Sequence, residues 1–528
     1  MQRSVLFFLL IAFICTYCTQ ERNAEALGER LVLPDLDYNL SLKPFYYGVA
    51  SGDPLSDRVV IWTKVIPEYQ MDSLEVTWEM ATDDAFHSIV KTGEVQADAA
   101  SGYTVKVDVD GLLPNATYFY RFNALDSTSV AGRTKTAPAG DHAEVRFAVV
   151  SCNNYEGGYF NGFARIAERN NLDAVIHLGD YIYEYGGDTT IARFHKPPHE
   201  IVSLEDYRTR YAQYRLDKDL MHAHQQHPFI TIWDDHEIAN NSYKEGAQNH
   251  QPDEEGNYEA RKQVARQAYF EWMPIREQVG GQLYRSFSFG NLASLIMLDE
   301  RLEGRSAPAE SIHDPAYESD ERDMLGEEQF NWLSTQLKDT SMRWKVIGNQ
   351  VIFSDLDISG AFPERARNLD AWDGYPAAKQ RIAGFMADNN IENVVILTGD
   401  THSSWAFEVA PEPTAPGNYN MNTGEGAIAV EFGTPSISSS NYDERMPVDS
   451  ARMIAGKYMD VAFNPHLKYV DLIEHGYLLL TLDTKKAVAE WYYVGDISQP
   501  GPEEELAKAL KVEEGTHHII NMEDEMDL

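Results

Sequence analysis

The stretch "DAVIHLGDYIYEYGG" (Asp173–Gly187) changes from apolar to polar within a few residues. Its opening "DAVI" has the composition of a buried β-strand. A carboxylate, Asp180, follows this strand, and three tyrosines come directly after it, at positions 181, 183 and 185. Two interpretations are open: a strand and turn with aromatic packing, or a strand end that carries chemistry. The ends of the other apolar stretches decide between them.

Three further apolar stretches end in polar clusters in the same way. "RFAVVS" leads into "CNN" (residues 152–154), "FITIW" into "DDHE" (234–237), and "NVVILTG" into "DTH" (400–402). In an open α/β sheet, ligands bind outside the carboxyl ends of the strands, so these clusters are expected to converge. Packing alone gives no reason to gather a thiol, several carboxylates, histidines and a phenol at one place. The pattern therefore favours a functional site.

A set of neighbouring carboxylates predicts bound cations. Unpaired carboxylates that lie close together raise one another's pKa and take up protons, whereas multivalent cations keep them ionised. A phenol becomes a good ligand only where a strong Lewis acid removes its proton. Thiolate and phenolate together suit a ferric ion, and the remaining oxygen ligands suit a harder second ion.

The composition sets broad limits on the function. A chain of 528 residues is too long for one ordinary core, so we expect at least two domains. With 43% hydrophobic and 11% aromatic residues, the chain has the composition of a folded protein. Its formal net charge of -39 argues against a stable nucleic-acid partner and against anionic lipid surfaces.

The N-terminus, "MQRSVLFFLLIAFICTYC" (residues 1–18), predicts export. Its apolar run is too short to span a bilayer and matches the core of a signal peptide. Cys18 is a candidate for lipidation, so a periplasmic protein, a cell-surface lipoprotein and a secreted protein all stay open. No other segment has the character of a transmembrane span. Cys152 would then be the one thiol of the mature protein, either a core residue or a metal ligand.

The chain divides into regions of different pattern. Residues 44–138 hold seven short segments with period-two alternation, which predicts an all-β sandwich of the immunoglobulin or fibronectin type. In residues 139–498 apolar strands alternate with helical stretches, which predicts a layered α/β domain. Residues 499–528 are polar and acidic, and we expect a loosely held tail.

Seven motifs in order resemble one family. "GDYIY", "WDDHE" and "GDTHSS" resemble the GD-x-x-Y, GNH(D/E) and GHxH elements of calcineurin-like metallophosphatases, the first in its purple-acid-phosphatase form. Asp replaces Asn in the second element and the first His in the third, and "SCNNY" stands where Asp-x-His is usual. With "GVASGDP", "SLEDYRTRYAQY" and "GNQVIFS", the chain resembles the PhoD-like alkaline phosphatases over roughly residues 44–495.

The resemblance implies two packed mixed sheets flanked by helices and an exported phosphatase and phosphodiesterase. It also implies a centre of one Fe³⁺ with one or two Ca²⁺ ions, on which a metal-activated water attacks phosphorus. His236 would be the catalytic residue that protonates or positions the leaving oxygen. The implied metal ligands are Cys152, Asp180, Tyr183, Asp235, Asp400 and His402, with Asp180 as a bridge and Tyr183 as the phenolate on iron. Which metal Asp235, Asp400 and His402 each contact stays open.

Other residues receive weaker expectations. Asn153, Arg208 and Arg210 are candidates to bind the substrate phosphate, with one of the two arginines pointing inward. Tyr181 and Tyr185 are expected to pack, and the histidines at 222, 224 and 227 to lie on a surface helix face. Two insertions, 186–198 and 307–325, are expected to form the pocket rim.

Three functions are weighed. The first is a monomeric phosphatase acting on small phosphate monoesters and diesters. A phosphodiesterase or phospholipase D-like hydrolase is the second, since the pocket rim decides between monoester and diester. The third is a surface binding protein with a decayed metal site, which the presence of every implied ligand disfavours.

Overall fold

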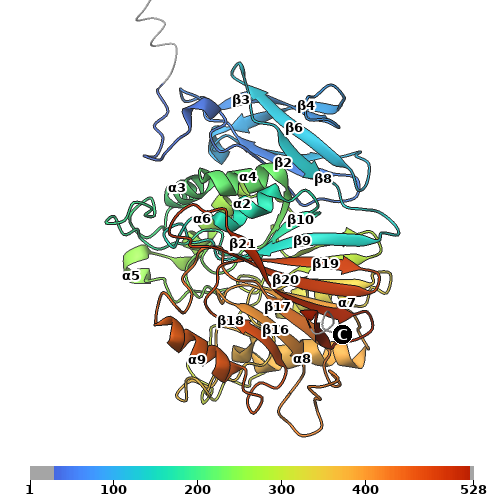
Figure 1. Cartoon of the computed structure of the whole chain (residues 1–528). Helices are drawn as coiled ribbons and strands as arrows, with labels where there is room; N and C mark the ends of the chain where they lie inside the picture. The colour runs from blue at the N-terminus through green and yellow to red at the C-terminus, as the bar shows by residue number, and fades with distance from the viewer. Residues whose placement is uncertain (1–28, 524–528) are drawn as a thin grey trace, which may run out of the picture.

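The computed structural model describes residues 29–523, which form three β-sheets and the helices that cover them (Figure 1). The predicted export segment, residues 1–18 with Cys18, lies outside the described residues. Between residues 29 and 523, no helix combines the length and the hydropathy that crossing a bilayer requires.

The first sheet has ten strands and joins the two halves of the chain. Its order is β22-β21-β20-β19-β9-β10-β11-β1-β2-β5, and β9, β10, β11 and β1 run parallel to one another. These four strands are buried along nearly their whole length, as parallel strands covered on both faces must be. The strands are β1 (Val49–Gly52), β2 (Val59–Lys64), β5 (Thr104–Val109), β9 (Glu144–Val150), β10 (Ala174–His177), β11 (Pro228–Thr231), β19 (Gly476–Asp483), β20 (Lys486–Val494), β21 (Glu504–Glu513) and β22 (Ile519–Asn521).

The second sheet has seven strands in the order β12-β13-β14-β15-β17-β16-β18. Its inner strands β13, β14, β15 and β17 are parallel, and the outer ones are antiparallel. The strands are β12 (Arg285–Phe289), β13 (Ala293–Met297), β14 (Trp344–Gly348), β15 (Val394–Thr398), β16 (Ser404–Val409), β17 (Ala429–Gly433) and β18 (Leu467–Asp471).

The two sheets pack face to face around the main core. One cluster of buried side chains joins Val149 and Ile176 of the first sheet to Leu295 and Val395 of the second. A second cluster fills the space between the outer face of the second sheet and helices α7 and α8. The structure therefore has the mixed α/β organisation, with several sheets, that the sequence predicts.

Helices cover the outer faces of both sheets (Figure 1). Helix α3 begins at a capping box, in which Ser203 and Asp206 each accept a hydrogen bond from the other's backbone N–H. Asp217 caps α4 in a similar way through the backbone N–H groups of Asp219 and Leu220. The helices are α2 (Asn161–Glu168), α3 (Leu204–Arg215), α4 (Lys218–Gln226), α5 (Pro252–Glu255), α6 (Tyr258–Trp272), α7 (Gly326–Leu337), α8 (Pro376–Asp388) and α9 (Val448–Tyr458), with short 3₁₀ helices at Leu40–Leu42, Ala99–Ser101 and Trp372–Gly374.

The N-terminal region contains two β layers, and one of them belongs to the first sheet. The third sheet, at the top of Figure 1, packs on β1, β2 and β5 around a core of its own. However, β1 also pairs in parallel with β11, so the layer continues into the α/β region. The assignment to the immunoglobulin or fibronectin class stays a prediction. The third sheet consists of β3 (Ser73–Ala81), β4 (Ile89–Asp98), β6 (Thr117–Ala124), β7 (Ser127–Thr128) and β8 (Gly132–Lys135).

The expectation of a loosely held tail over residues 499–528 is wrong for most of its length. Strand β21 pairs with β20, and β22 pairs with β21, so this segment forms one edge of the first sheet. Leu510, Val512 and Ile519 are buried in the main core. The acidic residues around them conceal an apolar alternation that is sufficient to hold a strand.

Candidate metal centre

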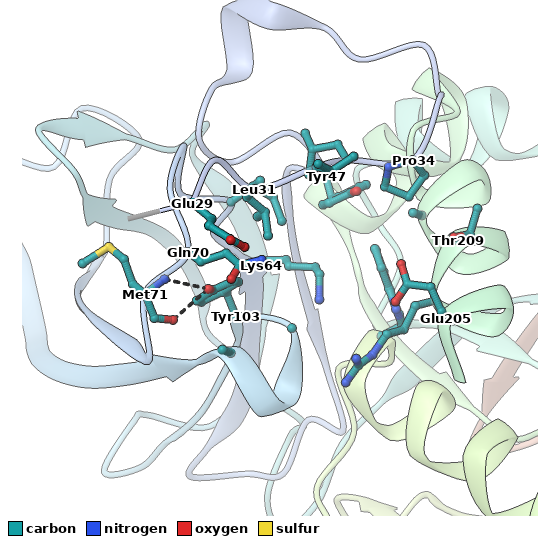
Figure 2. A pocket seen from close by; sticks show the side chains of 18 of the residues that line it. Glu29, Leu31, Pro34, Tyr47, Lys64, Gln70, Met71, Tyr103, Glu205 and Thr209 are labelled. Carbon is teal, nitrogen blue, oxygen red and sulfur yellow. Dashed lines mark hydrogen bonds between the residues drawn. The ribbon is translucent and has the colours of Figure 1, made fainter. Parts of the chain in front are cut away.

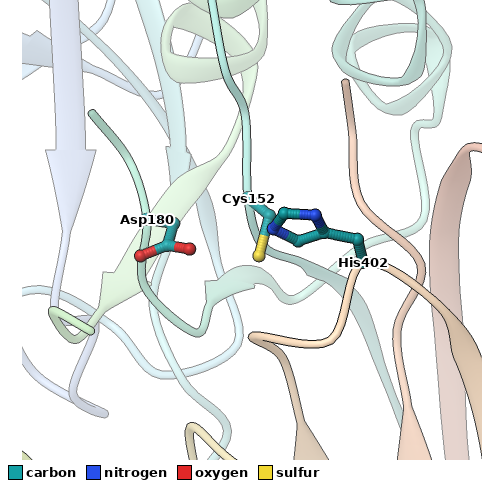
Figure 3. Close-up of side chains that lie close together, drawn as sticks. All are labelled: Cys152, Asp180 and His402. Carbon is teal, nitrogen blue, oxygen red and sulfur yellow. The ribbon is translucent and has the colours of Figure 1, made fainter. Parts of the chain in front are cut away.

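The loops that follow β9, β10, β11 and β15 converge, as the strand-end pattern predicts. They bring together three groups whose ligand atoms lie within 4.8 Å of one another. Figure 3 shows the first group, with the imidazole of His402 beside the thiol of Cys152 and the carboxylate of Asp180 facing them. Asp180 belongs to two groups and Asp235 to two, so the groups are contiguous. The groups are Cys152, Asp180 and His402; Asp180, Asp235 and His236; and Asp234, Asp235 and Asp400.

Four of these residues have an unusual backbone conformation. The φ angles of Cys152, Asp180, Asp400 and His402 lie between 56° and 59°, in the left-handed region that non-glycine residues seldom adopt. Such conformations persist where the surrounding structure enforces them, and they cluster at functional sites. Here each one occurs in a turn that directly follows a buried strand.

Several carboxylate oxygens of the centre have no hydrogen-bond partner. Tyr183 Oη donates to Asp180 Oδ2 at 3.0 Å, whereas Asp180 Oδ1 is buried without a partner. Asp234 Oδ2 and Asp235 Oδ1 are in the same situation. Burial raises the pKa of Asp180 well above its ordinary value; the charge of His236 acts to lower it, and the carboxylates Asp235 and Asp234 act to raise it. Buried oxygens without donors are costly, and cations would satisfy them.

The phenol and the thiol lie on the same side of Asp180. Tyr183 Oη accepts a hydrogen bond from Ser439 Oγ at 2.6 Å and lies 3.3 Å from His402 Nε2. Burial, followed by the charge of Asp180, raises the pKa of both the Tyr183 phenol and the Cys152 thiol well above their ordinary values. Both groups therefore keep their protons unless a strong Lewis acid displaces them, and this donor set fits such an ion.

One fixed positive charge, Arg301, lies among the carboxylates and was not among the predicted site residues. Its guanidinium donates to Asp234 Oδ1 at 2.5 Å, to Asp370 Oδ2 at 2.9 Å and to Asp400 Oδ1 at 3.3 Å. It also lies 3.7 Å from Asp235. Arg301 follows β13 in "LDER", which is one more apolar strand with a polar end, so the same pattern could have identified it.

Arg301 leaves the two neighbouring aspartates with different proton affinities. Burial raises the pKa of Asp234 to about 8, although Arg301 acts in the opposite direction. Burial also acts to raise the pKa of Asp235, but the charges of Arg301 and His236 outweigh it and lower that pKa. The arginine therefore compensates part of the negative charge, but it donates no hydrogen bond to Asp180 Oδ1, Asp234 Oδ2 or Asp235 Oδ1.

His236 is held by the carboxylate of Glu184, which lies in the stretch Asp173–Gly187. Its Nδ1 lies 2.6 Å from Oε2 of Glu184, which is itself fully buried. Burial acts to lower the pKa of His236, but Glu184, Asp235 and Asp180 together raise it well above its ordinary value. These carboxylates therefore favour the protonated imidazole, and Nδ1 is directed to Glu184. The role of Glu184 was not predicted, because its partner His236 lies 52 residues away in the sequence.

Two of the three predicted phosphate-binding residues lie near the centre but use their polar groups elsewhere. Arg210 donates to the backbone carbonyls of Tyr183, Tyr185, Lys196 and Pro197. The amide of Asn153 is likewise taken up by the Tyr181 carbonyl and by His177. Most of their polar atoms hold the loop that carries Tyr183, and a phosphate-binding role for either residue stays a prediction.

Arg208, the third candidate, lines a separate cavity (Figure 2). Its guanidinium binds both carboxylate oxygens of Glu271 and the Ala100 carbonyl. This cavity of about 610 Å³ lies between the N-terminal region and α3, and none of the candidate metal ligands of residues 29–523 lines it. Arg208 therefore lies away from the candidate metal ligands, on a helix face that points to this separate cavity.

The supporting aromatic and histidine residues differ in part from expectation. Tyr181 packs in the main core, whereas Tyr185 is partly exposed beside His236. His224 and His227 are fully buried, so the expected surface face is wrong for them. They bind the Tyr181 hydroxyl and a backbone carbonyl, respectively, and their environment is that of a packed core.

The comparisons with known proteins agree with this geometry. The family model described as "PhoD-like phosphatase" matches residues 147–491, and the model of the N-terminal domain of the same family matches residues 33–138. The chain belongs to the PhoD-like phosphatases. As a PhoD-like phosphatase it is a hydrolase of phosphoric esters, which confirms the family and the enzyme class predicted from the motifs.

Two relatives show how far this similarity extends. Alkaline phosphatase D of Bacillus subtilis (strain 168) is 35% identical over 492 residues, which cover 88% of this chain and 80% of the relative. A solved structure, "Structure of PhoD", is 34% identical with a TM-score of 0.79 and covers 92% of this chain and 93% of its own. The whole PhoD-like phosphatase fold, with its N-terminal region, is therefore shared. The roles of individual residues stay proposals.

Proposed function

We propose that this PhoD-like phosphatase is an exported, metal-dependent enzyme that releases phosphate from small phosphate monoesters and also cleaves diesters. One observation carries the proposal. Buried oxygens of Asp180, Asp234 and Asp235 lack hydrogen-bond donors beside a thiol and a phenol. No packing role explains that combination, whereas cations bound at these oxygens explain it.

The donor types support Fe³⁺ together with one or two Ca²⁺ ions. Cys152, Tyr183 and His402 would hold the iron, since thiolate and phenolate suit a ferric ion. Asp235 and Asp400 would hold the harder ion, and Asp180 would bridge the two. When bound, such ions supply a nucleophilic water near neutral pH and neutralise charge on the phosphoryl oxygens.

The side chains of the chain itself supply the remaining functions. His236, held through Nδ1 by Glu184, presents its Nε2 proton to the oxygen of the departing alcohol. Arg301 fixes Asp234 and Asp400 in place and limits the repulsion among the carboxylates. Arg210 holds the backbone of the Tyr183 loop and so positions the phenol.

The N-terminal segment supports export, and a periplasmic, cell-surface or secreted location is proposed on that basis. Lipidation of Cys18 is the proposed route for a surface lipoprotein. A second function, phosphodiesterase or phospholipase D-like hydrolysis, is favoured by an apolar cavity that adjoins Asp400 and His402, because it has room for a second ester group.

Elemental analysis of the purified protein, paired with turnover of 4-nitrophenyl phosphate and bis(4-nitrophenyl) phosphate across pH, tests the proposal. We expect iron and calcium in the protein, loss of turnover after chelation and recovery after metal addition. Tyr183→Phe should bind metal without the visible phenolate-to-iron colour. Turnover that survives complete metal removal contradicts the proposal.

The role of His236 has a test of its own. His236→Asn should lower kcat by about 10²- to 10³-fold on alkyl phosphates, which need a protonated leaving group. The loss should be smaller on 4-nitrophenyl phosphate, because nitrophenolate leaves without a proton. Equal losses on both substrates would reject His236 as the proton donor.

A further inference from the structure

A cavity of about 660 Å³ opens directly beside the metal centre. Its lining reaches Asp400, Thr401 and His402, which follow β15. The rest of the lining comes from two segments, 352–373 and 442–458, and from Trp405 of β16. The insertions 186–198 and 307–325, expected to form the rim, are absent from the lining that the described residues provide. The contiguity with two candidate ligands makes the cavity part of the substrate path.

Buried apolar side chains form one wall of the cavity. Trp405 and Tyr458 are buried and pack against each other with ring centroids 5.8 Å apart. The Trp405 indole N–H donates to Thr401 Oγ1 at 2.9 Å, next to the ligand His402. Ile352, Leu356 and Ile358 complete the apolar wall. Side chains held in this way form a slot before any ligand arrives, and a flat apolar group suits such a slot.

Two arginines line the cavity without a carboxylate partner. Arg365 donates to Asn368 Oδ1 at 3.3 Å, and within residues 29–523 neither Arg365 nor Arg445 forms an ion pair. Of the acids that line the cavity, Asp373 is paired with Lys379 and Asp400 with Arg301. Glu364 is exposed, as are Arg365 and Arg445. In a chain with a net charge of -39, two unpaired cations at one apolar cavity indicate an anionic ligand.

We propose that this cavity binds the organic group of the substrate, and that this group is an apolar, ring-bearing one which carries a further negative charge. The inference rests on the proposed function and deepens it by naming the substrate class. The phosphate lies at the metal centre, the ring lies against Trp405 and Tyr458, and Arg365 and Arg445 bind the second anionic group. A second phosphate, as in a diester chain, or a carboxylate on the ring meets the same requirement.

Phe362 provides the first test, because it lines the cavity and is 36% exposed, so its replacement should disturb the fold less than that of a fully buried wall residue. Phe362→Ser should raise KM for 4-nitrophenyl phosphate on the order of tenfold and leave KM for glycerol phosphate unchanged. Met446→Ser, elsewhere in the lining, should act in the same direction. Met453→Ser is the matched control, since this exposed residue of α9 is not part of the lining.

Arg365 provides the second test. Wild-type protein should prefer 4-carboxyphenyl phosphate to phenyl phosphate, and Arg365→Gln should remove most of that preference. Arg452→Gln, an exposed arginine of α9 outside the lining, is the control and should retain it. Comparing each variant with wild type on the same substrate removes differences in intrinsic reactivity.

The outcomes separate this inference from the function on which it rests. If wild-type protein hydrolyses no phosphate ester, the proposed function fails. If it hydrolyses both aryl and glycerol phosphates, but Phe362→Ser and Met446→Ser change the two KM values equally or not at all, the cavity does not bind the organic group. If only the aryl substrate responds but Arg365→Gln keeps the preference for a carboxylate, the anionic part of the proposal is overturned.

Discussion

Asp53 and Asp180 are two buried aspartates that follow strands of the same sheet. The carboxylate of Asp53 is fully hydrogen-bonded, whereas one oxygen of Asp180 has no partner. Both follow strands that run parallel to β11, and both have a left-handed backbone, with φ of 45° and 56°. Arg285 donates to both carboxylate oxygens of Asp53, at 2.8 and 3.0 Å, and the backbone N–H of Arg276 adds a third bond. Asp180 receives one hydrogen bond at Oδ2 and none at Oδ1.

The difference shows that position at a strand end does not by itself make a carboxylate a metal ligand. What decides is whether the folded chain supplies the compensating charge. At Asp53 it does so through an arginine that lies 232 residues away in the sequence. At Asp180 the imidazole of His236 is accompanied by the further acids Asp235 and Asp234, and Oδ1 has no donor. This incomplete compensation is the reason for proposing a bound cation at Asp180.

The largest effect is expected from replacement of Asp180, whose Oδ1 has no hydrogen-bond partner. Asp180→Asn should abolish metal binding and lower turnover by at least about 10³-fold, since it removes the proposed bridge. Metal content by elemental analysis and turnover of an aryl phosphate measure the two losses. A variant with full metal content and activity would remove Asp180 from the centre.

Replacement of Asp53, which is paired with Arg285, should lower the stability of the protein. Asp53→Asn leaves Arg285 buried without its counter-charge and should lower the free energy of unfolding by about 3–5 kcal/mol. Urea unfolding, followed by fluorescence, measures this change. Metal content per folded molecule should stay at the wild-type level. If Asp53→Asn loses metal without losing stability, the distinction between the two aspartates is broken.

Lys64 extends the comparison to a cation and should give the smallest effect. It is buried at the cavity of Figure 2, where its ammonium group donates to Thr104 Oγ1 at 3.3 Å, and burial lowers its pKa to about 7. Between about pH 7 and the ordinary lysine pKa near 10.4, the unfolded chain therefore binds more protons than the folded one. The contribution of Lys64 to stability should rise with pH through this window, on the order of 1–3 kcal/mol in total.

Lys64→Met measures this contribution. The difference in unfolding free energy between wild type and variant should change with pH between 7 and 10, in favour of wild type at the higher pH. Lys338→Met, at the exposed end of α7, is a control in which no such slope is expected. A pH-independent difference would mean that Lys64 is charged in the folded protein throughout this range.

The strand ends could be predicted from the sequence because their signal is local. An apolar run followed by Cys152, by Asp180 or by Asp400 is visible within ten residues, and the structure brings these residues together. Arg301 and Glu184 were not predicted as site residues, because their partners come from distant parts of the chain. The orientations of Arg208 and Arg210 could not be read from the sequence for a related reason. Two residues apart on one helix, they face different directions, and only packing decides which face is inward.

The strand pairing of β21 and of β1 in the first sheet was not predicted, for a different reason. Strand pairing depends on which segments meet, and composition does not encode that choice. The acidic segment around Leu510 therefore suggested a tail, although it pairs with β20. In the same way, the alternation of residues 44–138 predicted a sandwich without indicating that β1 would also pair with β11.

The pairing of β1 with β11 determines whether the second region can be expressed and fold without the first. The two family models meet near residue 140, which invites expression of the second region alone. That fragment would lose β1, β2 and β5 and would expose the backbone of β11 as an open edge, ready to pair with another copy. It would also lack Asp53, the partner of Arg285. The two regions are therefore expected to fold as one unit and to require expression together.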